Sequence, residues 1–363
     1  MTKPTVLALT FALVASCFHS HLAAQEPPTF GDLASLESSV PLGPKQEDVI
    51  RKYMRHWVGQ LKAAKKFDEV KQARDKLWTG FHAQATAYYQ LTYAKIAADE
   101  IPALLSQGDR LKQIHAAMAM SRMPRYTIQP GLEKMAASKN PAVRYWAVHG
   151  YRQASKEMML HRSCAKTMLA TLRKLGMTEP ASATVAAVFR ALRPYGEIKP
   201  VDLASLRTEL SKIWLARCGD VSRADLGFID AYREAIITLA PLDKKDDTKA
   251  VLQLLADAME AASMAFDAKA AKSDAGVRAS LEELLIDTEA RLGEILDMAV
   301  RPVRDALRNK DAQPAARIAD ALDAVKFTWM TSLVAKWKIT PRRIPRPIAN
   351  TTTKPTTAPS PGG

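Results

Sequence analysis

The feature that most constrains this chain is a helical spacing of apolar residues that continues almost without interruption after Pro44. In the first such segment, apolar side chains recur at steps of one, three and four residues and so share one helix face: Val49, Ile50, Tyr53, Met54, Trp57, Val58 and Leu61. Neither strand-like alternation nor an Asn-Gly hairpin signal occurs. Because 47% of the 363 residues are hydrophobic, a large core can form. We therefore predict an all-α fold.

This first segment predicts a helix at about residues 45–61, and others follow at about 68–78 and 81–98. Shorter helices are predicted from 108 to 241, among them one at about 111–120. Longer helices follow at about 247–272 and from 273 onward. The second of these carries a coiled-coil-like seam. Pro302 is expected to kink or end it, and a last helix should cover about 314–337.

Two helix openings indicate an internal repeat. Asn140-Pro141-Ala142-Val143-Arg144 combines an Asn cap with Pro at the first helical position, and a similar opening stands at Glu179-Pro180-Ala181, with the two prolines 39 residues apart. This resembles the opening of HEAT-type helical repeats, whose period is about 40 residues. The resemblance implies an irregular HEAT-like α-solenoid of antiparallel helix pairs. The longer C-terminal helices would form a hairpin or small bundle that caps the repeats.

The N-terminus has the layout of a secretory signal. Lys3 precedes an apolar run from Val6 to Phe18, and Ala23-Ala24 supplies small residues for cleavage. The run is too short to favour an anchor helix that spans a bilayer. We expect export to the periplasm or the exterior after removal of residues 1–24, and no membrane span thereafter. An alternative is lipidation at Cys17, since Val14-Ala15-Ser16-Cys17 resembles a bacterial lipobox.

These patterns predict a division of the chain into six parts. The parts are the signal peptide (1–24), an extended lead-in (25–44), N-terminal long helices (45–107), HEAT-like repeats (108–242), a C-terminal helical bundle (243–338) and a disordered tail rich in Pro, Thr and Arg (339–363).

The net charge of +14 is unevenly distributed. Residues 51–200 hold 26 basic and 10 acidic side chains, residues 201–300 hold 12 and 19, and residues 301–363 hold 12 and 4. A solenoid with a basic face suits a protein or anionic envelope component as partner. The alternative is a solvated face. Nucleic acid is less favoured, because aromatic residues are not interleaved with the basic ones.

One stripe in the basic region is a candidate anion-binding site. Tyr145, His149, Arg152 and Lys156 are spaced to lie on one side of the helix that begins at Pro141, and we expect Trp146 to face away from them. A phenol, an imidazole and two cations can together receive a carboxylate, phosphate or sulfate. The alternative is packing against a neighbouring repeat.

Signatures of catalysis are missing from the sequence. No nucleophile elbow, zinc-binding His pair, Cys-x-x-Cys motif or Gly-rich phosphate loop is present, and we predict neither a catalytic site nor a cofactor or metal site. An exported chain would favour a bridge between Cys164 and Cys218. If both lie on equivalent helices of adjacent repeats, however, those helices run parallel and the sulfurs would be roughly 20 Å apart.

The leading prediction is a non-enzymatic interaction or scaffold protein of the periplasm or cell envelope. It would bind a protein or an anionic surface partner through its basic helical-repeat face. Two alternatives are a secreted (α/α) toroid carbohydrate-active enzyme and an envelope-tethered structural protein held by its basic tail. The sequence predicts no oligomeric state.

Overall fold

The structure, a computed structural model, describes residues 27–36, 40–106, 109–193, 200–222, 224–239, 248–267 and 274–341. Within these ranges fifteen α-helices are present and no strand is found, so the prediction of an all-α fold is confirmed. No described helix is both long and apolar enough to cross a membrane.

The element bounds follow the chain order. The α-helices are α2 (Phe30–Ala34), α3 (Pro44–Ala63), α4 (Phe67–Phe81), α5 (Ala87–Glu100), α6 (Arg110–Ser121), α7 (Gln129–Ala136), α8 (Pro141–Leu160), α9 (Arg162–Thr178), α10 (Ser182–Ala191), α11 (Pro200–Ser222), α12 (Leu226–Leu239), α13 (Thr248–Asp267), α15 (Ala275–Leu296), α16 (Pro302–Leu307) and α17 (Pro314–Ala324). Two 3-10 segments, η1 (Ile101–Leu104) and η2 (Tyr126–Ile128), and two π-helical segments, η5 (Val325–Met330) and η6 (Leu333–Trp337), accompany them.

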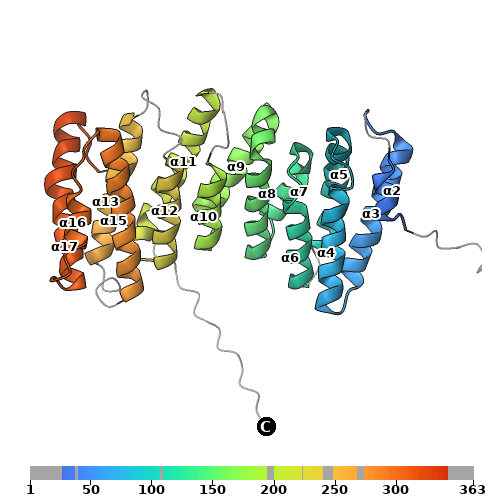
Figure 1. Cartoon of the computed structure of the whole chain (residues 1–363), viewed down its shortest axis with the longest axis horizontal. Coiled ribbons are helices and arrows are strands. Elements are labelled where there is room, and N and C mark those ends of the chain that lie inside the picture. Colours follow the sequence, from blue (N-terminus) through green and yellow to red (C-terminus); the bar gives the residue numbers. More distant parts are fainter. Residues whose placement is uncertain are drawn as a thin grey trace, which may run out of the picture.

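Consecutive helices alternate between two packed layers. In one layer α4, α6, α8, α10, α12 and α15 pack each on the next, and in the other α3, α5, α7, α9, α11 and α13 do the same. Helices adjacent in sequence also pack across the layers, most extensively in the pairs α3/α4, α7/α8, α8/α9, α9/α10, α11/α12 and α13/α15. Figure 1 shows the result as an open row, with α3 and α17 near its opposite ends. This arrangement is compatible with a helical repeat fold.

The period of the row is close to that of helical repeats. Helices of the first layer begin at residues 67, 110, 141, 182, 226 and 275, so successive starts lie 31 to 49 residues apart. The alternation of layers continues on both sides of residues 108–242. The division of the chain at residues 107 and 242 stays a prediction.

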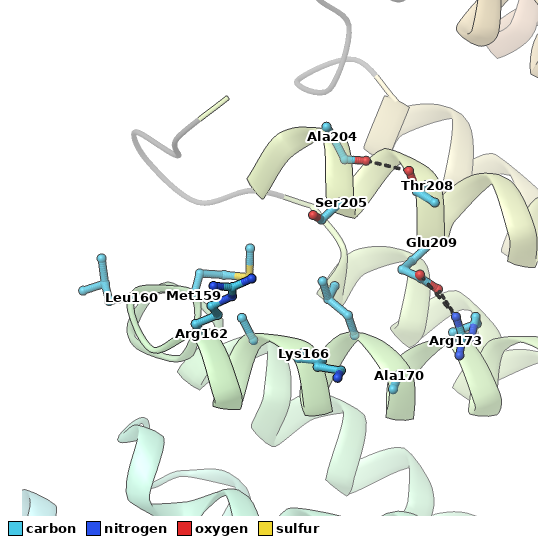
Figure 2. A pocket seen from close by; sticks show the side chains of 12 residues that line it. Met159, Leu160, Arg162, Lys166, Ala170, Arg173, Ala204, Ser205, Thr208 and Glu209 are labelled. Atoms are coloured by element: carbon cyan, nitrogen blue, oxygen red, sulfur yellow. Dashed lines mark hydrogen bonds and ion pairs between the residues drawn. The ribbon is translucent and has the colours of Figure 1, made fainter. Parts of the chain in front are cut away.

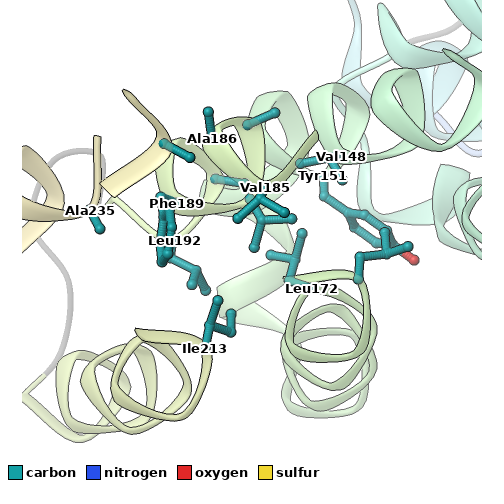
Figure 3. Packing of buried hydrophobic residues seen from close by; sticks show 14 of the residues in the cluster. Val148, Tyr151, Leu172, Val185, Ala186, Phe189, Leu192, Ile213 and Ala235 are labelled. Atoms are coloured by element: carbon teal, nitrogen blue, oxygen red, sulfur yellow. The ribbon is translucent and has the colours of Figure 1, made fainter. Parts of the chain in front are cut away.

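The core lies between the two layers. Val148 of α8, Leu172 of α9, Phe189 of α10 and Ile213 of α11 are fully buried and converge from the four helices, as Figure 3 shows. The apolar faces of the helices therefore bury one another along the whole row, and each unit depends on its neighbours.

Gly150 of α8 packs closely against residues of α6 and α7. A Cβ atom there would stand 2.5 Å from Leu132 Cδ2 and 3.2 Å from the Ser121 Cα, whereas one at Gly59 of α3 would meet nothing within 4 Å. We expect Gly150→Ala to lower the free energy of unfolding by about 1–3 kcal/mol through overpacking. Gly59→Ala, the matched control, should raise it by up to about 1 kcal/mol. Urea denaturation checks both; equal shifts would contradict the close packing at Gly150.

Several predicted helix ends are wrong. α5 begins at Ala87 rather than near Phe81, because α4 continues through the buried Phe81 and a turn follows. α15 ends at Leu296, where Asp297 takes the left-handed conformation, and Pro302 begins α16 instead of interrupting α15. The last helix begins at Pro314 as predicted, but becomes π-helical after Ala324.

No disulfide joins the two described cysteines, Cys164 and Cys218. Cys164 lies near the start of α9 and Cys218 near the end of α11, and these helices are neighbours in one layer. The buried Cys218 Sγ accepts a hydrogen bond from the Tyr232 hydroxyl at 3.0 Å.

Candidate binding surface

The repeat opening identified from the sequence contains an ion pair that joins α8 to the short connection between α9 and α10. Arg144 of α8 donates from Nε to Glu179 Oε2 at 2.5 Å and from Nη2 to Oε1 at 2.8 Å. The Glu179 carboxylate is 1% exposed and also accepts the Ala181 amide N–H at 3.2 Å, just before α10. One unit earlier, the Asn140 side-chain amide donates to Gln113 of α6. Polar contacts at the helix starts therefore set how α6, α8 and α10 stack.

A groove lies along the outside of the other layer, between α9 and α11. We call this hollow of about 880 Å³ the α9–α11 groove; its lining residues are Met159, Leu160, Arg162, Ala165, Lys166, Leu169, Ala170, Arg173, Ala204, Ser205, Thr208 and Glu209. Figure 2 shows the side chains of both helices facing the same open space. The groove is partly open to solvent, neither an enclosed cavity nor a flat surface.

The α9 rim of this groove is basic. α9 carries Arg162, Lys166, Arg173 and Lys174 and no acidic residue. Arg162, Lys166 and Lys174 are exposed and have no ion-pair partner within the described part of the chain. Arg173 pairs with Glu209 of α11 at 3.3 Å. The rim therefore keeps a positive potential that a ligand can meet.

The α11 rim is built differently. Its lining side chains are small or hydroxylated, apart from Glu209, which also accepts from Lys212 at 2.9 Å. With two cations on this one carboxylate, the groove has no unbalanced negative charge among its described lining residues.

The predicted stripe on α8 is only partly exposed. Tyr145, His149 and Arg152 are half-buried and Lys156 is exposed. Trp146 was expected to face away, but its ring lies 5.6 Å from the Tyr145 ring and 5.2 Å from the His149 ring, measured between centroids. Residues three positions apart are neighbours on a helix, so Trp146 contacts His149 and belongs to the same surface as the stripe.

Two residues that the sequence interpretation missed lie near this stripe. The Arg122 guanidinium, at the end of α6, stacks 4.7 Å from the Trp78 ring of α4 and acts electrostatically on His149. Residues 78, 122 and 149 come from three helices of one layer, and no linear spacing could have joined them. The surface thus combines Trp, Tyr, Arg and His, residue types that include the usual anchors of protein interfaces.

The pKa of His149 is lowered, first by burial and then by the Arg152 and Arg122 guanidinium groups. Its Nδ1 is buried without a hydrogen-bond partner in the described structure. The imidazole is therefore neutral near pH 7, and in this form it contributes no positive charge to anion binding.

A pH dependence of stability follows from His149 and from His115. Burial, followed by Arg74, lowers the pKa of His115, with Asp75 opposing. As pH falls through about 6.5, the unfolded chain takes up protons before the folded one, so stability is complete above that pH and declines below it. We expect the urea midpoint to fall less from pH 7.5 to 5.5 in the His115→Asn/His149→Asn variant than in wild type. Parallel falls would contradict the two lowered pKa values.

No metal site was predicted, and no group of three or more His, Cys, Asp or Glu residues in the described ranges is arranged to hold an ion. Cys17, the signal segment 1–24 and the tail beyond Pro341 lie outside the described residues, so lipidation and export stay predictions.

Comparisons with known proteins identify no similar protein. No protein-family model matches the chain, and neither a curated protein nor a solved structure matches it significantly. Fold and surface together define the class of protein: an open all-α array of stacked helix pairs with a basic, apolar-floored groove on one layer.

Proposed function

We propose that this chain is a non-enzymatic interaction protein of the periplasm or cell envelope that binds an anionic partner through its basic helical face. The observation that carries the proposal is a set of four exposed cations at the end of α8 and along α9 that have no ion-pair partner in the described structure: Lys156, Arg162, Lys166 and Lys174. Two of them, Arg162 and Lys166, line the α9–α11 groove. Export rests on the signal-like N-terminus.

The charges farther along the row are arranged differently. Arg190 of α10 pairs with Glu234 of α12, and Arg233 of α12 pairs with Asp287 of α15, both at 2.9 Å. Arg190 and Arg233 are thus balanced within the chain, whereas the four cations at the end of α8 and along α9 have no such partner in the described structure. The half-buried stripe residues Tyr145, His149 and Arg152 would add contacts from α8, on the opposite layer.

The alternative of a toroid enzyme has no supporting observation. A toroid closes on itself, whereas the described helices form an open row with its ends far apart (Figure 1). Tethering by the basic tail involves residues outside the described ranges and stays an untested alternative.

Crosslinking and pull-down from the native envelope tests the proposal. The full-length tagged chain should retain a specific set of acidic components that elute at raised salt, because exposed ion pairs are screened. Reversing Lys156, Arg162, Lys166 and Lys174 to Glu should abolish their capture.

The matched control reverses four exposed lysines toward the far end of the row, Lys249, Lys310, Lys326 and Lys336, and keeps the same net charge. It should capture the components as wild type does. Equal loss in both variants would mean that net charge alone acts. Unchanged capture by the first variant would contradict the proposal. Replacing Arg152 and Lys156 by Ala measures how much of the capture depends on the stripe on α8.

A further inference from the structure

We propose that the α9–α11 groove receives an acidic amphipathic α-helix of a partner protein. This inference rests on the proposed function and names the class of partner. Three features of the groove carry it: the spacing of the cations, the apolar floor and the small side chains of the α11 rim.

The spacing of the cations along α9 sets the length of the helix that the groove can bind. Arg162, Lys166 and Arg173 stand at i, i+4 and i+11 and so line one face of α9. At a rise of 1.5 Å per residue, this stripe is about 16 Å long, which equals about three turns of a bound helix. Carboxylates at matching intervals on such a helix would meet Arg162 and Lys166.

The floor supplies the apolar contact that holds an amphipathic helix. Leu169 lies at the base, Ala165 and Ala170 flank it, and Leu160 at the open end is 72% exposed. An exposed leucine beside a groove has an apolar surface that a partner's leucine or isoleucine can cover. On the opposite rim, Ala204 and Ser205 are small enough to let a partner backbone approach closely (Figure 2).

The electrostatics are asymmetric along the groove. Arg162 and Lys166 lie at the start of α9, where the helix dipole adds positive potential, and neither has an ion-pair partner in the described structure. At the other end Arg173 is already engaged by Glu209. The acidic residues of the occupant should therefore cluster near Arg162, with apolar residues toward Arg173.

A protein helix fits the groove better than an anionic lipid. Ligand pockets for small apolar molecules bury most of the ligand surface, whereas this groove is partly open to solvent and carries hydroxyl groups at Ser205 and Thr208. A helix needs burial on one face only, which an open trough supplies.

The test measures binding of two fluorescent 14-residue helical peptides to the full-length protein by anisotropy. One peptide carries leucines at i, i+3, i+7 and i+10 flanked by glutamates, and its twin has lysine at every glutamate. We expect the acidic peptide to bind at least tenfold more tightly than the basic twin. Arg162→Glu/Lys166→Glu should weaken it at least tenfold, and Leu160→Ser, which changes no charge, at least threefold.

The control variant Lys249→Glu/Lys326→Glu should bind the acidic peptide within twofold of wild type, and circular dichroism verifies that each variant is folded. Equal binding of the two peptides, or unchanged binding by the Arg162/Lys166 variant, would overturn the proposal. So would phosphatidylglycerol vesicles that displace the peptide and bind more tightly, since this outcome assigns the groove to lipid. The acidic peptide could fail to bind while the variant with all four exposed cations reversed to Glu still loses envelope capture. In that case the proposed function stands and the assignment of the groove alone is wrong.

Discussion

Replacing Glu179 by alanine is expected to destabilise the protein by about 3–5 kcal/mol, because the change leaves an uncompensated charge in a largely buried site. Glu179 is 1% exposed and accepts two hydrogen bonds from Arg144, whose side chain is 16% exposed. The loss also removes the acceptor for the Ala181 amide. The packing of α8 against α10 should loosen.

Urea denaturation followed by tryptophan fluorescence measures this effect. The matched control is Glu209→Ala: Glu209 itself is 13% exposed, but its partners Arg173 and Lys212 are 40% and 45% exposed and stay hydrated without it, so the change should cost about 0–1 kcal/mol. A cycle of Glu179→Ala, Arg144→Ala and the double variant isolates the coupling between the two residues. If Glu179→Ala costs no more than Glu209→Ala, the buried pair does not hold the two helices together.

Replacing Glu289 by alanine is expected to cost about 3 kcal/mol or more, since three donors would lose their acceptor at about 1 kcal/mol or more each. Glu289 of α15 is 1% exposed. It accepts the Val303 and Arg304 amides at 2.8 and 2.9 Å, at the start of α16, and the Trp329 indole N–H at 3.0 Å. One carboxylate thus ties α15 to α16 and to η5.

Hydrogen exchange locates this second effect. Protection should fall over residues 298–341 and stay unchanged over α3 to α8, because each unit of a stacked array contacts only its neighbours. Glu294→Ala on the same helix is the control, since Glu294 is 61% exposed and pairs with Arg291 three residues away. Exchange that rises along the whole chain would contradict a stack of neighbour-limited units.

The sequence predicted the fold class and most helix starts because these depend on local signals. Pro141 after Asn140 and the helix start beside Asp274 both appear as predicted, and each preceding polar side chain caps its helix. The helical spacing of apolar residues was likewise enough to predict that α3 has a buried face.

The rest depends on contacts between distant segments. The α9–α11 groove brings Arg162 and Ala204 to one hollow although about 40 residues separate them in the sequence, and no sequence motif indicates it. The placement of Trp146 was wrong because its ring reaches His149, three residues further along α8. Spacing along α8 also says nothing about Arg122, which acts on His149 from the end of α6. The π-helical turns of η5 and η6 also lack a local signature; η5 packs on α16 and α17, and η6 on η5.

Site-specific photocrosslinking tests the central claim most directly. Benzoylphenylalanine at Ala170, inside the α9–α11 groove, is compared with the same residue at the exposed Gln72 of α4, in the full-length chain in its native envelope. We predict adducts at position 170 that map to an acidic helical segment and vanish at high salt or with Arg162→Glu/Lys166→Glu. Adducts that form equally at position 72, or that map to a neutral or basic segment, would contradict binding through this groove.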